Sequence, residues 1–249
     1  MEPYAREELL ACCIARLVGD ARHVAVGAAS PIPATGVFLA KALYSRNLRI
    51  SLLHKRSGNA FTEGSRELFD LAGQGRIDLF FLGGAQIDGE ANINLVQADG
   101  KRFPGSFGSA FMYFTAGRTI LFREEHSKRV LVPKVDFISA PGWSPPEVER
   151  RGGPQALLTG KALFSWQPDR RRFRLESVHP GHALDEVVDS TGFEFDRAPD
   201  IHATPGPTAG ELTLLRDVVA KQIAENYPEF AARVWPARGV SFEAPAVRP

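Results

Sequence analysis

The sequence has very little cysteine. Its 249 residues include two, Cys12 and Cys13, which stand side by side. Adjacent cysteines fit neither a disulfide framework nor a common zinc spacing, and a helix would send them to different faces. The sequence therefore predicts reduced cysteines and no metal site.

An excess of either charge is also missing, as are long apolar runs. Thirty basic and 29 acidic residues give a formal net charge of +1, so nothing in the balance favours nucleic acid or an anionic membrane as a partner. No apolar run approaches the ~20 residues that span a bilayer. The opening stretch, MEPYAREELLACC, is acidic where a secretory signal is basic. We therefore expect a cytoplasmic protein with a small-molecule or protein partner.

Hydrophobic residues make up 44% of the chain, enough for a full core. Apolar periodicity predicts helices over residues 7–18, 35–43 and 65–72, and strands over residues 23–26, 48–53 and 79–82. Strands that alternate with helices favour a parallel sheet. Further strands are predicted at residues 118–122, 130–132 and 135–139 with little helix between them. This crowding predicts a mixed sheet in an α/β fold.

The C-terminal part is expected to begin with a small β meander over residues 156–159, 162–166 and 173–178. Helices are predicted at residues 184–188 and 211–224, and a flexible tail after about residue 236. We expect one domain over residues 1–249.

The segment 79–110 is the strongest candidate for a site. A buried strand, Leu79 to Leu82, ends at Gly83-Gly84, and ligands bind at such strand ends in open α/β sheets. Two interpretations stay open for the polar residues that follow: they orient a ligand, or they brace the turn, since Asn and Asp commonly bond nearby backbone. These residues are Gln86, Asp88, Asn92 and Asn94.

A second candidate is the polar loop after the strand at residues 48–53. His54 could act as a general acid or base there, or it could be a solvated loop histidine. Glu63 is either a displaced catalytic carboxylate or an exposed glutamate. A third stretch with His126, Lys128 and Arg129 is expected to be a solvated charged turn.

Several motifs together resemble the β-type subunit of family I CoA-transferases, nearest to that of the glutaconate type. They are Gly83-Gly84-Ala85-Gln86-Ile87-Asp88, Asn92-Ile93-Asn94, Gly105-Ser106, Lys128-Arg129, Val135 to Trp143, His179-Pro180-Gly181 and Thr191 to Asp196. The resemblance implies an open three-layer α/β sheet of the CoA-transferase (NagB/RpiA-like) type. It also implies an acyl-CoA thioester as substrate with no tightly bound cofactor, and an α-type partner subunit in a heterodimer or α2β2 heterotetramer.

The resemblance places substrate or CoA contacts in two segments, and it includes an oxyanion loop in which Phe107 replaces a family glycine. The implied contact residues are Gly83, Gly84, Gln86, Asn94, Gly105, Ser106, Phe107, Gly108 and Ser109. Cations at residues 128–129 could meet CoA phosphates or the partner. The family's nucleophilic glutamate falls on Leu53, which cannot form a glutamyl thioester.

We therefore expect a catabolic enzyme that cleaves a carbon–carbon bond hydrolytically or decarboxylates its substrate. The glutamate-lacking branch of the family, which includes the cholesterol ring-opening hydrolase, has such activities. Two alternatives stay open. One is true CoA transfer, with Glu63 or a carboxylate of the partner as nucleophile. The other is a non-catalytic scaffold role.

Overall fold

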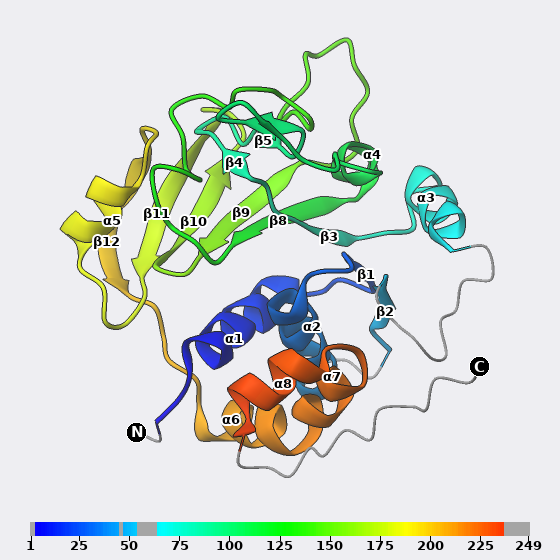
Figure 1. The fold of residues 1–249 in the computed structure, drawn as a ribbon, viewed down its shortest axis with the longest axis vertical. Helices are drawn as coiled ribbons and strands as arrows, with labels where there is room; N and C mark the ends of the chain where they lie inside the picture. Colours follow the sequence, from blue (N-terminus) through cyan, green and yellow to red (C-terminus); the bar gives the residue numbers. More distant parts are fainter. Residues whose placement is uncertain (1–2, 45–46, 54–63, 237–249) are drawn as a thin grey trace. The chain divides into compact units, whose positions relative to one another are not determined.

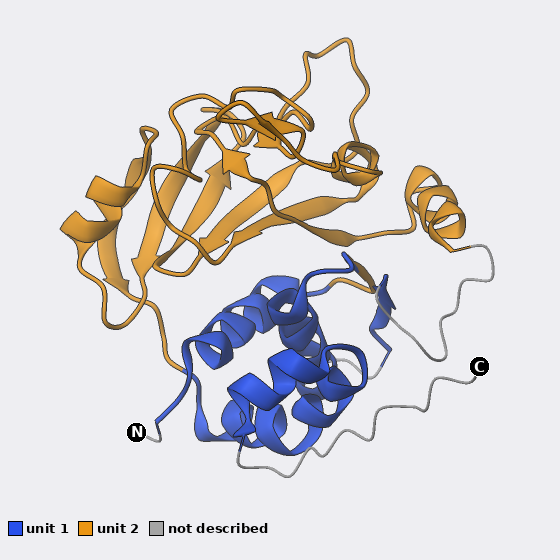
Figure 2. Cartoon of the chain, viewed as in Figure 1, with its two compact units in different colours: residues 1–20, 26–60, 207–249 blue, residues 21–25, 61–206 orange. Residues whose placement is uncertain are grey.

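The computed structural model describes residues 3–44, 47–53 and 64–236, and the chain divides into two compact units (Figures 1 and 2). Unit 1 comprises residues 1–20, 26–60 and 207–249, and unit 2 comprises residues 21–25 and 61–206. His54, Glu63 and the tail after residue 236 lie outside the described residues. The single domain stays a prediction.

Unit 1 is mainly helical. Its elements are α1 (Arg6–Val18), α2 (Pro31–Leu43), β2 (Arg49–Leu52), α6 (Ala209–Leu214), the π-helical turn η1 (Leu215–Val219), α7 (Ala220–Asn226) and α8 (Pro228–Val234). Helices from the two ends of the sequence pack together. The carboxylate of Glu8, buried in α1, accepts hydrogen bonds from Arg216 Nε at 2.7 Å and Trp235 Nε1 at 3.0 Å. Buried carboxylates are tolerated when they are paired in this way.

Helices α1 and α2 approach closely at Gly36. A Cβ atom there would lie 2.4 Å from Ile14 Cγ2 and 2.8 Å from the Ala11 carbonyl oxygen. The glycine is therefore required by the packing of two helices.

We expect Gly36→Ala to lower the free energy of unfolding by about 1–3 kcal/mol, the usual cost of overpacking a core. Urea unfolding followed by circular dichroism would measure the loss. Gly210→Ala is the matched control, because a Cβ atom at this helical glycine meets nothing within 4 Å. Equal stabilities of the two variants would contradict the prediction.

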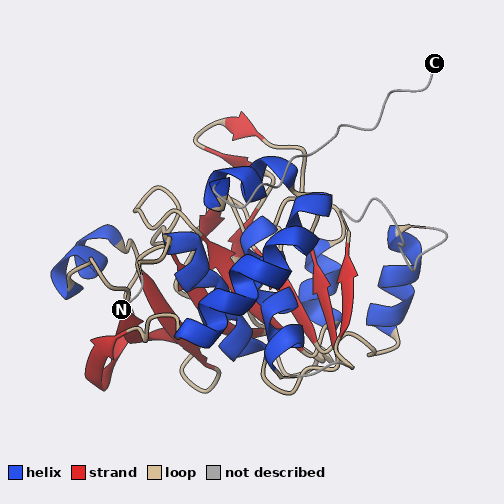
Figure 3. Ribbon diagram, turned by 90° about the horizontal axis from the view of Figure 1, so that it is seen from below, coloured by secondary structure: helices blue, strands red, loops and turns tan. Residues whose placement is uncertain are grey.

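Unit 2 is organised around strands of a mixed sheet, in the order β12-β11-β10-β9-β8-β3-β1. Pairing is parallel from β1 through β3 and β8 to β9, antiparallel from β9 through β10 to β11, and parallel again between β11 and β12. Figure 3 shows the strands in red. The strands are β1 (His23–Val26), β3 (Leu79–Leu82), β8 (Arg118–Arg123), β9 (Pro154–Thr159), β10 (Ala162–Gln167), β11 (Arg172–Val178) and β12 (Asp196–Ala203). The predicted mixed sheet and the meander are confirmed.

Smaller elements of unit 2 build the segment between β3 and β8. Two ribbons form there, β4 (Gln86–Ile87) with β5 (Ile93–Asn94), and β6 (Gln97–Ala98) with β7 (Lys101–Arg102). The helices of unit 2 are α3 (Ser65–Gly73), α4 (Ser109–Thr115) and α5 (Leu184–Ser190). No described helix reaches the length and apolarity that a membrane crossing requires.

The strands predicted at residues 130–132 and 135–139 are wrong. The first segment makes one isolated bridge, Leu131 to Ile87, and the second makes none, although Ala140 directly after it bridges Ile93. The apolar residues at 130–132 and Val135 are buried, whereas Phe137 and Ile138 are exposed, and Pro133 between the segments lacks the N–H group that a continuing strand would donate. Burial therefore accounts for the apolar residues of the first segment and for Val135, without a strand.

Candidate functional site

The Gly105–Ser109 loop connects β7 to α4 and holds one phenylalanine in solvent. Phe107 is 81% exposed and has a φ of 47°, in the left-handed region that side chains rarely adopt. Its ring lies 5.7 Å from that of Phe69 on α3, centroid to centroid. The loop therefore adopts an unfavourable backbone conformation at Phe107, and this conformation places an aromatic side chain in solvent.

The aromatic residue Phe69 also explains why position 108 is a glycine. A Cβ atom at Gly108 would lie 2.0 Å from Cζ of Phe69, so a larger residue forces the α3 side chain to move. Sequence analysis selected Gly108 but missed Phe69, whose helix lies far earlier in the chain. A lone phenylalanine in a helix carries no signal for such a contact.

The backbone N–H groups of the Gly105–Ser109 loop differ in whether they have an acceptor. Ser109 donates its N–H to the Ser106 carbonyl oxygen at 2.9 Å, and its hydroxyl donates to the same oxygen at 2.6 Å. The N–H groups of Phe107 and Gly108 have no acceptor within the part of the chain that the structure describes. Adjacent free amides of this kind can stabilise a developing negative charge on oxygen.

Gly83 and Gly84 lie at the end of β3, where the backbone passes very close to other main chain. A Cβ atom at Gly83 would lie 2.8 Å from the Phe122 carbonyl oxygen, and one at Gly84 would lie 2.7 Å from the Gln86 carbonyl oxygen. Neither glycine has a positive φ. Close approach, rather than an unusual backbone conformation, explains both residues.

Gln86 and Asn94 are buried and bond to each other. The Asn94 side-chain N–H donates to Gln86 Oε1 at 2.8 Å, and the same oxygen accepts the N–H of Asp136 at 3.0 Å. Asn94 Oδ1 accepts the N–H of Val96 at 3.1 Å. Exposures of 4% and 0% give these amides a bracing role in the structure, and their contact with substrate stays a prediction.

Asp88 and Asn92 form a second buried brace beside the first. The Asp88 carboxylate accepts N–H groups from Glu90 at 3.1 Å, from the Asn92 backbone at 3.0 Å, from the Asn92 side chain at 3.1 Å and from Val135 at 3.4 Å. Asn92 Oδ1 accepts the N–H of Gly142 at 3.1 Å. The motif thus fastens the β4–β5 turn to the segment around residues 135–142.

Leu53 follows β2 directly and is half-buried. Its N–H donates to the Val26 carbonyl oxygen at 3.1 Å, which continues the strand geometry of unit 1 to this position. An alkyl side chain therefore stands at the strand end where the family resemblance places the nucleophile.

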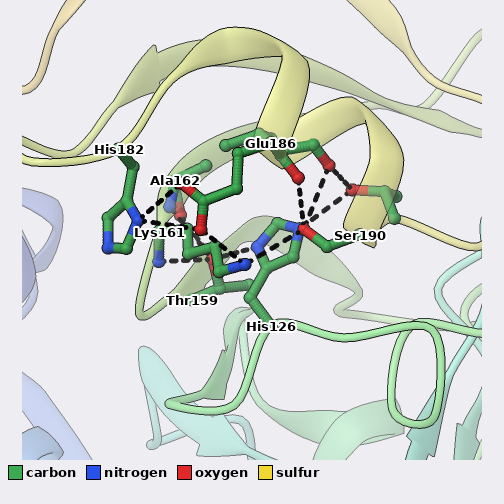
Figure 4. Close-up of polar contacts among 9 residues, drawn as sticks. His126, Thr159, Lys161, Ala162, His182, Glu186 and Ser190 are labelled. Atoms are coloured by element: carbon green, nitrogen blue, oxygen red, sulfur yellow. Dashed lines mark hydrogen bonds and ion pairs between the residues drawn. The ribbon is translucent and has the colours of Figure 1, made fainter.

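His126 corrects the expectation of a solvated charged turn, because it is 5% exposed (Figure 4). Its Nδ1 lies 2.8 Å from Thr159 Oγ1 and its Nε2 lies 2.9 Å from Thr191 Oγ1. Both hydroxyls also donate to carbonyl oxygens, Thr191 to that of Val187 at 2.7 Å and Thr159 to that of Ala162 at 3.1 Å, so the imidazole lies between two threonines that are themselves held in place. Burial, reinforced by the positive charge of Lys161, lowers the pKa of His126 to about 4.

His179 repeats this arrangement nearby; from the sequence it was named as part of a family motif and not as a site residue. It is 2% exposed, with Nδ1 2.8 Å from Thr204 Oγ1 and Nε2 3.0 Å from the Thr159 carbonyl oxygen. Burial lowers its pKa to about 4. Both imidazoles are therefore neutral at neutral pH and connect strands β9, β11 and β12 with the end of α5.

A charged cluster around Glu186 of α5 lies beside His126 (Figure 4). Lys161 Nζ lies 2.9 Å from Glu186 Oε1, and His182 Nδ1 lies 3.0 Å from Glu186 Oε2. Hydrogen bonds from Lys161 and His182 lower the pKa of Glu186 to about 2. The cluster attaches α5 to the β9–β10 turn. No group of three or more potential metal ligands occurs in residues 3–44, 47–53 and 64–236.

A family model described as coenzyme A transferase matches residues 50–190, more than half of the chain. The chain belongs to the coenzyme A transferase family. Its relatives identify it as a β-type chain. The β-type chain of glutaconate CoA-transferase from Acidaminococcus fermentans is 26% identical over 253 residues, which cover 87% of this chain and 92% of that protein.

Two further relatives carry other activities in their names. The IpdB subunit of the cholesterol ring-cleaving hydrolase of Rhodococcus jostii is 29% identical over 62% of this chain and 64% of its own length. The structure of Rhodococcus jostii IpdAB matches with a TM-score of 0.77 at 25% identity, covering 94% of this chain and 99% of that chain. The decarboxylase AibA/AibB matches with a TM-score of 0.75 at 23% identity, covering 94% and 100%, and supports the fold alone.

Proposed function

We propose that this chain is the β-type subunit of a heteromeric, cytoplasmic enzyme that acts with an α-type subunit on an acyl-CoA thioester. The reaction is hydrolytic carbon–carbon cleavage or decarboxylation, and no cofactor is tightly bound. Leu53 at the end of β2 is the observation that carries the choice of reaction. Family membership supports the thioester, and the subunit names of the relatives support an α-type partner.

A leucine excludes covalent transfer through this position. Transfer by a glutamyl thioester needs a carboxylate that attacks the acyl carbon, and an alkyl side chain has no lone pair to donate. The N–H groups of Phe107 and Gly108 nevertheless retain what a thioester needs: donors for an oxygen that becomes negative, whether as a tetrahedral adduct or as an enolate. We assign His54 or Glu63 as the general acid or base in this scheme.

The distinguishing experiment is a trap for a covalent intermediate. The assembled enzyme is incubated with acyl-CoA substrates and treated with borohydride or hydroxylamine, and this chain is examined by mass spectrometry. We expect no adduct on the wild-type chain and an adduct at residue 53 in Leu53→Glu, because the variant restores a carboxylate. Leu53→Gln is the control of equal size without the charge.

A covalent CoA adduct on the wild-type chain would refute the proposal. Exchange of labelled acetate into an acyl-CoA pool, abolished by Glu63→Gln, would instead establish CoA transfer. Turnover that is unchanged in both His54→Ala and Gly108→Ala would assign this chain a scaffold role.

A further inference from the structure

Unit 2 contains a cavity of about 680 Å³ whose charged lining is entirely positive. It lies where β8 and β9 begin, is lined by residues of the loop 142–153, and reaches the turn between β10 and β11. Among its described lining residues there is no aspartate or glutamate. The side chains that define its chemistry are Arg118, Arg150, Arg151, Arg171, Trp143 and Trp166.

Arg151 and Arg171 have no carboxylate partner within the part of the chain that the structure describes, in contrast to the residues on either side of Arg171. Arg170 and Arg172 both bond to Asp196, at 2.7 Å and 3.3 Å. Arg171 stands between them in sequence, and within the described residues neither it nor Arg151 forms an ion pair. Unpaired guanidinium groups around a concave surface attract anions, and arginine binds phosphate with two parallel hydrogen bonds.

Arg150 adds a positive charge to the cavity lining, and its guanidinium group is held in place and partly removed from water. Its guanidinium donates to the carbonyl oxygens of Gly152 at 2.6 Å, Pro141 at 2.8 Å and Tyr113 at 3.1 Å, and it lies 4.7 Å from the Tyr113 ring centroid. Carbonyl groups hold the guanidinium without neutralising it. A positive charge that is half-buried is screened less by water than an exposed one and so acts more strongly on a ligand.

Arg171 is oriented by a tryptophan. Its guanidinium carbon lies 3.6 Å from the Trp143 ring centroid, and its backbone has a φ of 49°. A residue without a side chain, or asparagine, would adopt this turn conformation more easily. The chain instead places an arginine there and stacks it on an aromatic face, the arrangement in which arginine and tryptophan hold flat, charged ligands.

We propose that this cavity binds a nucleotide, with its phosphates on Arg151 and Arg171 and its base against Trp143 and Trp166. A volume of about 680 Å³ exceeds what one inorganic phosphate fills and suits a drug-sized ligand. Trp143 orients Arg171, but Trp166 would add nothing to the binding of a simple anion, whereas base stacking on aromatic rings is favourable. The shared chemistry belongs both to a free nucleotide and to the nucleotide end of coenzyme A.

The test is calorimetric titration of the full-length chain with 3′,5′-ADP, ADP, coenzyme A, pantetheine and inorganic pyrophosphate. We expect Arg151→Gln and Arg171→Gln each to weaken nucleotide binding about tenfold, since each loses a charge-assisted hydrogen bond. Trp166→Leu should weaken nucleotides but leave pyrophosphate unchanged. Arg197→Gln, on the exposed part of β12, is the matched control and should leave all affinities as in the wild type.

The outcomes separate the two sources of the ligand. Binding of coenzyme A and 3′,5′-ADP, both weakened by the arginine variants, assigns the cavity to the nucleotide end of coenzyme A. Binding of ADP but not of coenzyme A assigns it to a free nucleotide. Absence of nucleotide binding, or binding that Arg151→Gln and Arg171→Gln leave unaltered, would overturn the proposal. Because the readout is binding and not turnover, its failure is distinct from failure of the proposed reaction.

Discussion

Asp88→Ala should lower the free energy of unfolding of unit 2 by about 3–5 kcal/mol. The carboxylate accepts four N–H groups, three of them from Asn92 and Glu90 within one turn. Its side chain is 3% exposed, so water cannot replace it easily. Each buried donor left without an acceptor costs about 1–3 kcal/mol, and partial relaxation of the turn reduces the total.

A reciprocal exchange tests whether the hydrogen-bond pattern, rather than the turn's packing, carries this effect. In Asp88→Asn the new amide faces the Asn92 side-chain amide, two donors against each other, and stability should fall. Asn92→Asp added to this variant supplies an acceptor opposite the amide and reverses the direction of the bond. We expect the double variant to recover part of the loss, which a double-mutant cycle quantifies.

Guanidinium unfolding monitored by tryptophan fluorescence would provide these free energies, since the chain contains three tryptophans. Asp200→Ala is the control, because Asp200 is exposed on β12. A loss below about 1 kcal/mol for Asp88→Ala would mean that water satisfies the four donors, contrary to the bracing role.

Acidification should destabilise the fold well before most carboxylates are protonated. The pKa values of His126 and His179 fall from the ordinary 6.5 to about 4 in the folded chain. The unfolded chain therefore binds more protons between these values, and stability decreases as the pH falls through this window. Above about pH 6.5 the contribution is fully present, and below about pH 4 it has been lost.

The expected size is large because two groups act in the same direction. A pKa difference of about 2.5 corresponds to an upper bound of about 3 kcal/mol for one histidine. Burial is the main cause for both, since an imidazolium among Thr159, Thr191 and Thr204 would lose its hydration. The pair therefore accounts for up to several kcal/mol of stability across this pH window.

Urea unfolding at a series of pH values would measure this slope. His126→Gln and His179→Gln should each reduce the slope between pH 6.5 and about 4, whatever their effect at neutral pH. His202→Gln is the control, because His202 is exposed on β12. Imidazole resonances that titrate near the ordinary value of 6.5 for either buried histidine would contradict the prediction directly.

Local patterns predicted most of the fold. The strands at residues 23–26 and 79–82 have the predicted bounds, because a short apolar run that ends at a turn signal is a local property. The edge strand β12 and the short helix α4 were missed. β12 alternates intermediate and exposed residues and contains Pro199, so its sequence lacks the apolar run of a buried strand. α4 has only seven residues and follows a glycine-rich loop.

Local patterns predicted much less of the site. Gly108 was selected as a loop glycine, yet its reason is the ring of Phe69 from another helix. His126 was expected to be solvated because its neighbours in sequence are charged, whereas two threonines distant in sequence bury it. The cavity with Arg151 and Arg171 combines a proline-rich loop with a hairpin turn. None of these contacts produces a periodic pattern in the sequence from which it could be predicted.

The sequence by itself determined the family, the alternation of strands and helices, the presence of a leucine at position 53 and the glycine-serine composition of the Gly105–Ser109 loop. These properties depend on residue identity and on short-range order, which a chain carries before it folds. Tertiary structure alone decided that Gln86, Asp88, Asn92 and Asn94 brace a turn, that two histidines are held neutral, and that arginines and tryptophans meet around one cavity. Burial and long-range pairing create those properties, because both exist only once distant segments pack together.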